Sequence, residues 1–313
     1  MDTVYTTSQL VLEVRDQLNE YNIDSITDEA ILRVLSRAKD SATTILAKTY
    51  PDQIVEVMDP IAASNIMLPE GLHEERINKV EYLYSSNYLH DVERISYRDR
   101  TKYTTTHKGI PRYYYIVKNK LFLLPEPQGG ELILWYIPEP EPFIEEEGRI
   151  LQINEAGKYI VLDSIGDNIS AEEDELKNYF NIISKYGEIK ATLQVEQIDT
   201  EDNIIYFKGT PDNATVYGRT VVGELPDDVE AHDYICTANG TCVCDLKKSA
   251  RNYIIQYAVV ELKRKLGEPT EMEDRILSKL ETQLDTTWVR REVSRKVGQK
   301  SAIWGGRRSL VWR

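Results

Sequence analysis

Hydrophobic positions near the N-terminus recur at the spacing of a helix face. One apolar stripe runs from Leu10 to Tyr21, and a broader one runs from Ile31 to Leu46. Thr6 precedes Gln9 by the three residues of a capping box, and Thr27 is the N-cap candidate for the second stripe. The pattern therefore predicts two amphipathic helices before the first proline, with their apolar faces packed in a bundle.

Residues 52–144 are predicted to form an antiparallel β domain, because short β-rich runs alternate there with turn residues. These runs are Ile54–Val57, Val80–Tyr84, Tyr113–Val117, Leu121–Leu124 and Leu132–Ile137. The third and fourth runs flank a short polar stretch, which predicts a hairpin within a small sandwich or barrel. The proline-rich stretch Pro138–Pro142 is stiff and extended, and it suits a domain exit.

Residues 145–235 have the pattern of a second, inserted β domain. Their β-rich runs are Ile150–Ile153, Tyr159–Leu162, Ile189–Val195, Ile204–Phe207 and Thr215–Val222. A polar stretch with helical character, Ala171–Tyr179, lies between the second and third runs. We expect a compact, barrel-like insert that contains one helix.

The C-terminal third returns to helical spacing. An apolar stripe from Leu246 to Leu262 ends before Gly267, a helix-stopping glycine. Thr270 then precedes a second stripe that runs from Met272 to Leu284. The periodicity fades after Trp288, where a basic, glycine-interrupted arm begins.

The predicted fold class is α+β. A bundle of N- and C-terminal helices carries a projecting antiparallel β domain, an inserted second β-barrel-like domain and an extended C-terminal arm. The predicted boundaries are 1–51 and 236–287 for the bundle helices, 52–144 and 145–235 for the two β domains, and 288–313 for the arm.

The charge is distributed unevenly along this plan. The chain has a formal net charge of −14, and the segment 145–233, with 21 acidic and 7 basic residues, accounts for all of it. The arm, 288–313, has 8 basic residues and one acid. An overall acidic protein is not a general nucleic-acid-coating protein. The acidic insert and the basic arm are therefore expected to serve different contacts.

The sequence favours a protein made inside a cell and independent of membranes. Its longest apolar runs are far too short to span a bilayer, and no basic region followed by an apolar stretch opens the chain. Three cysteines cannot form a stapling framework in a chain of 313 residues, so a reducing compartment is expected.

Catalytic signatures are absent from the sequence. It has no nucleophile elbow, zinc-protease pair, phosphate-binding loop or dinucleotide fingerprint. The histidines, His73, His90, His107 and His232, show no ligand spacing and are expected on the surface or in loops. Carboxylate runs such as Glu145–Glu147 are expected to be solvated faces. We therefore predict that the protein is not an enzyme and uses no cofactor.

One group of residues has the chemistry of a zinc site. His232, Cys236, Cys242 and Cys244 are residue types that bind zinc, but their spacing matches no standard structural zinc pattern. Buried free thiols are the favoured interpretation, and the zinc site stays open as the alternative.

The C-terminal arm has the composition of a docking segment, in which arginine and tryptophan occur together. Its candidate contact residues are Trp288, Arg290, Arg291, Arg295, Lys296, Ile303, Trp304, Arg307, Arg308, Leu310, Trp312 and Arg313. A solvated, frayed tail is the simpler interpretation, but such a tail does not favour so many aromatic and apolar side chains. Nucleic acid is a weaker alternative target, since arginine pairs with phosphate.

Taken together, the sequence resembles the head-to-tail adaptors of short-tailed phages, the tail tubular protein A-like group. The patterns that match are Gln9–Glu20, Ile31–Ala38, Leu68–Glu70, Gly109–Tyr113, Leu121–Pro127, Leu132–Tyr136 and Leu225–Asp228. These are hydrophobic and turn patterns that cover about two-thirds of the chain. The acidic insert departs from the simple family plan and is similar to what a larger connector, such as those of crAss-like phages, would carry.

The resemblance implies a structural virion protein in the neck or tail region that is assembled in the host cytoplasm. Such adaptors form a homo-oligomeric ring, most often a dodecamer, which binds the portal protein and the next tail or ring protein. Double-stranded DNA passes through the ring without sequence recognition. The alternative is a carbohydrate- or receptor-binding tail module that uses the inserted β domain. The sequence leaves open whether the acidic insert faces the channel or the outside.

Overall fold

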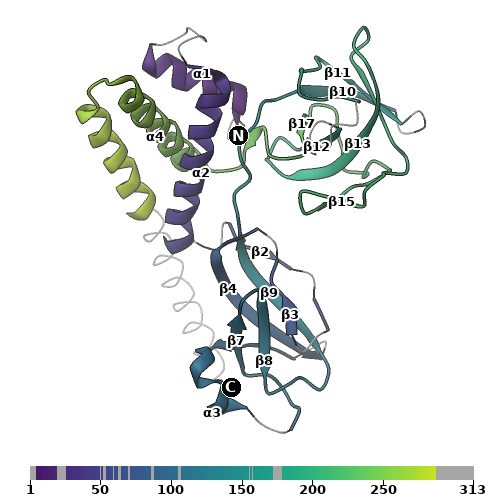
Figure 1. Cartoon of the computed structure of the whole chain (residues 1–313), viewed down its shortest axis with the longest axis vertical. Helices are drawn as coiled ribbons and strands as arrows, with labels where there is room; N and C mark the ends of the chain where they lie inside the picture. Colours follow the sequence, from purple (N-terminus) through teal and green to yellow (C-terminus); the bar gives the residue numbers. More distant parts are fainter. Residues whose placement is uncertain are drawn as a thin grey trace, which may run out of the picture. The chain divides into compact units, whose positions relative to one another are not determined.

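The structure is a computed structural model that describes residues 5–19, 26–49, 51, 54–58, 60–62, 65–69, 71–85, 88–104, 107–154, 156, 158–171 and 178–286. The fold is mixed α+β, which confirms the predicted class. The chain divides into two compact units (Figure 1). The first comprises residues 1–42 and 141–313, and the second comprises residues 43–140.

The N-terminal helices begin where the sequence predicts, but the first ends at Leu18, before the predicted Tyr21, because Asn19 adopts the left-handed conformation of a C-cap. Helix α1 (Thr7–Leu18) starts with the predicted capping box between Thr6 and Gln9. Helix α2 (Asp28–Thr49) starts after Thr27, whose hydroxyl accepts a hydrogen bond from the backbone N–H of Ala30 at 3.2 Å. The residues on the apolar stripes of both helices are buried, as the predicted bundle requires: Leu10, Val14, Leu18, Ile31, Val34, Leu35, Ala38 and Ala42.

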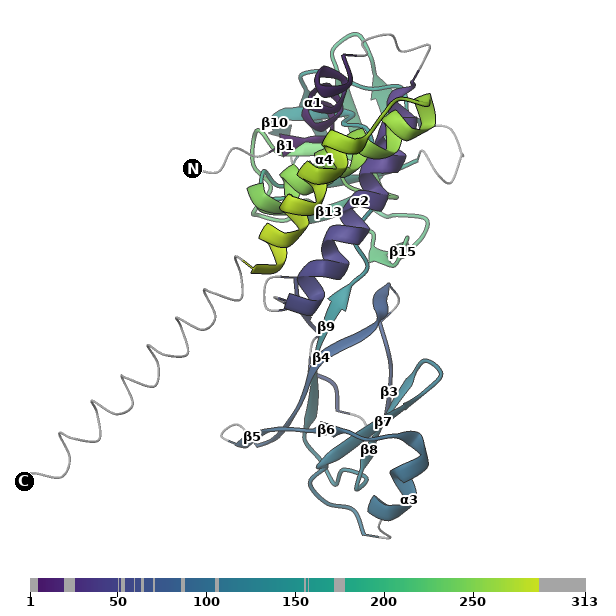
Figure 2. The same cartoon turned by 90° about the vertical axis from the view of Figure 1, so that its left-hand side faces the viewer.

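The C-terminal helices complete the bundle of the first unit (Figure 2). Helix α4 (Lys248–Leu266) ends at Gly267, which adopts the left-handed conformation of a C-cap with φ 75°. A second helix follows over 271–286. It is joined to α4 by ion pairs from Lys263 to Glu273 at 2.5 Å and from Arg264 to Asp274 at 2.8 Å.

Two segments that are far apart in the sequence pair beside this bundle in a short antiparallel ladder. Strand β1 (Tyr5–Thr6) pairs with β18 (Val243–Cys244), and the N–H of Thr7 donates to the carbonyl of Cys242 at 2.8 Å. The guanidinium of Arg251 in α4 lies 3.6 Å from the ring centroid of Tyr5. This ladder places α1 beside α4. Neither strand was predicted, because a two-residue strand carries no period.

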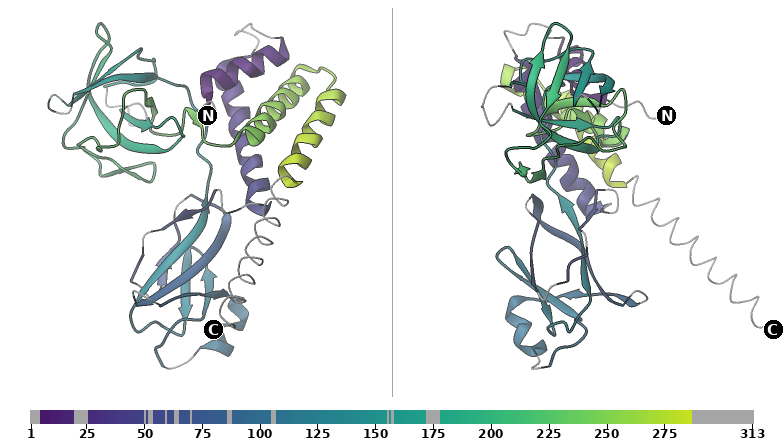
Figure 3. Two further views of the ribbon diagram at one scale, coloured as in Figure 1. Left: turned by 180° about the vertical axis from the view of Figure 1, so that it is seen from behind. Right: turned by 90° about the vertical axis from the view of Figure 1, so that its right-hand side faces the viewer.

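The insert is a closed six-stranded barrel with the strand order β10-β11-β14-β13-β12-β17 (Figure 3). All neighbouring strands in it are antiparallel. Phe180, Ile182, Leu193 and Phe207 are among the buried residues of its core. The strands are β10 (Gly148–Asn154), β11 (Tyr159–Leu162), β12 (Tyr179–Ile183), β13 (Ile189–Asp199), β14 (Ile204–Phe207) and β17 (Tyr234–Thr237).

Two predictions for the insert need correction. The predicted strand Thr215–Val222 is a hairpin of β15 (Thr215–Val216) and β16 (Arg219–Thr220), because Tyr217 and Gly218 have positive φ and reverse the chain. The predicted helix Ala171–Tyr179 ends in a strand, because Tyr179 begins β12. Residues 172–177 of that prediction lie outside the described part of the chain.

The second unit, residues 43–140, holds two four-stranded sheets with the orders β2-β9-β4-β5 and β3-β8-β7-β6. The predicted hairpin forms from β7 and β8, with Tyr115 opposite Phe122. Tyr82, Leu121, Leu132 and Leu134 lie in one buried core. The strands are β2 (Glu56–Val57), β3 (Asn65–Met67), β4 (Leu72–Ser85), β5 (Tyr88–Asp91), β6 (Glu93–Arg94), β7 (Tyr113–Val117), β8 (Lys120–Leu124) and β9 (Glu131–Pro138).

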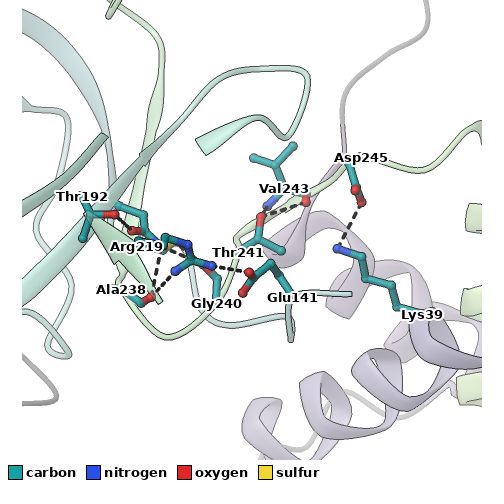
Figure 4. Close-up of polar contacts among 11 residues, drawn as sticks. Lys39, Glu141, Thr192, Arg219, Ala238, Gly240, Thr241, Val243 and Asp245 are labelled. Atoms are coloured by element: carbon teal, nitrogen blue, oxygen red, sulfur yellow. Dashed lines mark hydrogen bonds and ion pairs between the residues drawn. The ribbon is translucent and has the colours of Figure 1, made fainter. Parts of the chain in front are cut away.

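Within the first unit, the junction between barrel and helices is built around a fully buried amide, that of Asn181 in β12. This amide donates to the carbonyls of Ala238 at 3.3 Å and Gly240 at 3.1 Å, and it accepts from the hydroxyl of Thr192 at 2.8 Å. Arg219 also donates to the Ala238 carbonyl and forms an ion pair with Glu141 at 2.5 Å (Figure 4). The turn by which the chain leaves the barrel is therefore held by side chains of three strands.

On the helix side of this junction, the ammonium of Lys39 in α2 pairs with Asp245 at 3.1 Å (Figure 4). The same ammonium lies 4.9 Å from the ring centroid of Phe143. The N–H of Phe143 donates to the hydroxyl of Ser36 at 2.8 Å. Both segments that connect the barrel to the rest of the chain thus contact α2.

We predict that Asn181→Leu lowers the free energy of unfolding by about 1–3 kcal/mol, because it leaves the buried hydroxyl and carbonyls around it with fewer partners. Chemical unfolding measures this change. Gln197→Ala, which alters an exposed amide of the same barrel, should stay within about 0.5 kcal/mol of the parent. Equal stability of Asn181→Leu and the parent would show that the junction does not depend on this amide.

Candidate interaction surfaces

The outer face of the β3-β8-β7-β6 sheet displays aromatic rings. Side chains alternate along β7, so that Tyr114 is only 5% exposed whereas Tyr113 and Tyr115 lie half-buried on the opposite face. Across the hairpin, the rings of Tyr115 and Phe122 stack with centroids 5.2 Å apart and planes 9° apart. Met67 of the neighbouring strand β3 is 56% exposed.

Two further tyrosines reach this face from the segment between β6 and β7. Tyr97 lies in the short 3-10 helix η2 (Tyr97–Asp99), and its ring centroid is 5.9 Å from that of Tyr115. Tyr103, at the end of α3 (Arg100–Tyr103), lies 4.3 Å from Tyr113. Figure 2 shows α3 near β7 and β8. We call these five rings the aromatic face: Tyr97, Tyr103, Tyr113, Tyr115 and Phe122.

The segment that carries the aromatic face is rich in basic side chains, and the exposed carboxylate of Glu93 lies beside Tyr113 at its start. The segment 94–124 contains eight basic residues and one acid, Asp99. The guanidinium of Arg100 lies 3.7 Å from the ring centroid of Tyr97. In the part of the segment that the structure describes, Lys102 pairs with Asp99 and Lys108 with Glu126. Arg94 is in register with Tyr114 and lies on the opposite face. The other exposed residues without an ion pair there form what we call the basic rim: Arg98, Arg112, Lys118 and Lys120.

The barrel presents the opposite charge. Exposed carboxylates lie in the β13–β14 turn, where the N–H groups of Glu201 and Asp202 donate to the carboxylate of Asp199 and leave their own side chains in solvent. A second exposed group precedes β17. Among the described residues, none of these exposed carboxylates forms an ion pair, and we call them the acidic turns: Glu201, Asp202, Glu224, Asp227, Asp228 and Glu230.

The carboxylate run Glu145–Glu147 is only in part the solvated face that we predicted, since Glu145 is exposed and Glu147 is buried. Glu147 is only 2% exposed, and its carboxylate accepts from the backbone N–H of Asn168 at 3.2 Å and from its amide at 2.7 Å. Burial raises the pKa of Glu147, and the hydrogen bonds from Asn168 partly offset this effect. The signal that the prediction missed is the position of Glu147 directly before β10, where the backbone enters the barrel.

The four residues of the candidate zinc site differ in burial. Cys236 and Cys242 pack in one buried cluster with Ile183 and Val243, whereas His232 is exposed. The hydrogen bond with Cys236 and burial raise the pKa of the Cys242 thiol, and burial raises the pKa of Cys244 to about 11. All three cysteines are free and buried. Among the described residues, no group of three or more His, Cys, Asp and Glu side chains is placed to hold a metal ion.

One histidine departs from the expectation that all four are surface or loop residues. His90 lies in strand β5, where its ring meets the ring of Tyr82 edge-on with centroids 5.9 Å apart. Its Nε2 atom is hydrogen-bonded to the carbonyl of Pro111. His107 and His232 are exposed.

The whole predicted docking arm, from Trp288 to Arg313, lies outside the described residues, so its contacts stay a prediction. No described helix is both long and apolar enough to cross a membrane. Comparisons with known protein families and with curated proteins give no match for this chain.

The alternation of buried and partly exposed tyrosines along β7 allows a test of the aromatic face. We predict that Tyr114→Ala lowers the free energy of unfolding by about 3 kcal/mol, because it leaves a cavity in the core. Tyr113→Ala should cost only about 1 kcal/mol, since it removes a half-exposed cross-strand contact. Chemical unfolding of both variants compares the two values. Equal losses would mean that both tyrosines are core residues and that the face is not a free surface.

The raised pKa of Glu147 determines the direction in which the free energy of unfolding changes with pH. Because the folded state raises the pKa of this carboxyl, the folded protein holds the proton more tightly than the unfolded chain does. Its stability relative to Glu147→Gln should therefore decrease as the pH rises from about 4 to about 7. Chemical unfolding of both proteins at several pH values measures this difference. A difference that is constant or increases with pH contradicts the burial of the charge.

Proposed function

We propose that this chain is a structural subunit of the head-to-tail connector of a short-tailed phage, where it binds the portal and extends the DNA channel to the tail. The observation that carries the proposal is the separation of the chain into two compact units, one with a basic segment beside exposed aromatic rings and the other with exposed carboxylates that form no ion pair among the described residues. One unit offers an aromatic face with a basic rim, and the other offers an acidic barrel. The sequence resemblance to the adaptor family points the same way.

A ring subunit needs this kind of surface. It must meet a neighbour on two sides, a ring above and a ring below, so several contact areas are required on one chain. Half-exposed tyrosines such as Tyr113 and Tyr115 supply rigid, amphipathic contact area, and arginine at the edge is typical of interface hot spots. The chain has 20 tyrosines.

The acidic barrel fits a channel protein in either orientation. If the acidic turns face the channel, their charge repels the phosphate backbone and keeps double-stranded DNA from adhering. If they face outward, they bind a basic partner. The DNA passes without sequence recognition in both cases.

In this proposal the arm from Trp288 to Arg313 makes the contact with the portal. Its tryptophans fill apolar pockets, and its arginines pair with acidic grooves on the portal surface. The hydrogen bond with Cys236 and burial raise the pKa of Cys242, and burial raises that of Cys244, so in this proposal both thiols take no part in chemistry. We therefore assign the protein no reaction and no cofactor.

The second candidate function is a carbohydrate- or receptor-binding tail module. The observation that favours it is the half-exposed stack of Tyr97, Tyr115 and Phe122, because flat rings can stack on sugars. This stack lies in the 43–140 unit and not in the insert, where the sequence hypothesis placed the binding site. Glycan-array binding without oligomerisation would favour this module over the connector.

We predict that deletion of residues 288–313 leaves a folded protein that no longer binds portal rings of the same phage. Co-sedimentation and negative-stain microscopy with the full chain and the deletion measure binding, and circular dichroism checks the fold. A second variant, Trp304→Ala with Trp312→Ala, keeps the arginines of the arm. It should bind portal rings more weakly than the full chain if the tryptophans are anchors. A deletion that binds portal rings as well as the full chain does would refute the role of the arm.

A further inference from the structure

We propose that neighbouring copies of this chain bind head to tail, with the aromatic face and basic rim of one copy against the acidic barrel of the next. This inference rests on the proposed connector function and names the two surfaces that join the subunits. The occupant of the aromatic face is therefore a second copy of the chain.

The first argument is charge complementarity within one sequence. The segment 94–124 has eight basic residues and one acid, whereas 145–233 has 21 acids and 7 bases. Arg98, Arg112 and Lys120 of the basic rim have no ion pair among the described residues, and neither do Glu201 and Asp202 of the acidic turns. Two surfaces with free, opposite charges on every copy attract each other between copies.

The second argument is the apolar centre of the basic surface. Tyr97 is 47% exposed and Met67 is 56% exposed, and Tyr113, Tyr115 and Phe122 are half-buried beside them. A surface that combines exposed aromatic rings with arginines has the composition of a protein–protein interface. When carboxylates of the next copy pair with the basic rim, the aromatic rings are covered and provide the apolar area that the contact buries.

The third argument is geometric. The two surfaces differ, so the contact between them is heterologous, and a repeated heterologous contact generates a ring when its rotation closes. Two identical surfaces would instead give a closed dimer. A head-to-tail contact is therefore the kind of contact that the proposed ring requires.

Double-stranded DNA is the competing occupant of the basic rim, because lysine and arginine also pair with phosphate. The second copy is favoured because it offers free carboxylates together with apolar surface, such as Tyr186, which is 71% exposed on the barrel, whereas duplex DNA offers phosphates to the rim. The rings of Tyr115 and Phe122 stack on each other in the sheet and are not splayed to receive bases.

The test uses two charge-reversal variants of the full chain. The rim variant carries Arg98→Glu, Arg112→Glu and Lys120→Glu. The barrel variant carries Glu201→Lys, Asp202→Lys and Asp227→Lys. All six side chains are exposed and without a side-chain hydrogen bond or ion pair among the described residues, so both variants should fold.

Matched controls place the same changes of charge on exposed positions in the C-terminal helices and in the turn between them. Lys248→Glu, Arg275→Glu and Lys279→Glu match the rim variant, and Glu268→Lys, Glu281→Lys and Asp285→Lys match the barrel variant. Circular dichroism and thermal unfolding check that all four proteins are folded.

Sedimentation equilibrium at low salt then measures self-association. We expect the parent and both controls to associate with rising concentration, and association to weaken at about 0.5 M salt. Each charge-reversal variant alone should associate at least about tenfold more weakly than its control. An equimolar mixture of the rim and barrel variants should form mixed oligomers, because each surface again meets its opposite charge.

Three outcomes overturn the inference: a parent that stays monomeric at every concentration, variants that associate as their controls do, and a mixture that does not associate. If instead the parent binds a double-stranded DNA fragment and only the rim variant loses that binding, the rim is a DNA surface. None of these outcomes touches the proposed function, since portal binding and virion location are measured separately and a ring can assemble on the portal alone.

Discussion

The pairing of β1 with β18 is the constraint on which the first unit depends. Residues 5–6 pair with residues 243–244, so this ladder closes a loop that contains all of the chain between them. Closing so long a loop costs conformational entropy, which must be offset by burial. Leu10 and Val14 of α1 and Ile254 and Ala258 of α4 are fully buried, and this packing provides the compensation.

With the bundle closed in this way, the β elements are free to carry surface chemistry. The barrel has its own core, the Asn181 amide holds the turn by which the chain leaves the barrel, and the Lys39–Asp245 ion pair joins the following segment to α2. The 43–140 unit has a separate core around Tyr82 and Leu121. Because each unit is stabilised by its own core, the aromatic face and the acidic turns are available for contacts with other proteins. A protein with several such surfaces is suited to assembly.

Much of the fold could be predicted because it follows local rules. The capping box at Thr6, the C-cap at Gly267 and the strand Ile204–Phe207 lie where the sequence indicates. The parts that were missed depend on distant partners. Strand β12 follows an acidic run with helical character, and only its pairing with β13 and β17 makes it a strand. The alternation of Tyr113 to Tyr115 was visible, but the rings that meet them come from η2 and α3, whose position no local pattern encodes.

The central claim is that this chain works by fitting between copies of itself and other virion proteins. Electron cryo-microscopy of purified phage particles tests this claim most directly. The account predicts a ring between portal and tail in which the helical bundle, the six-stranded barrel and the 43–140 unit can be fitted as separate bodies. Particles whose capsid–tail junction is complete but contains no copy of this chain would contradict the account.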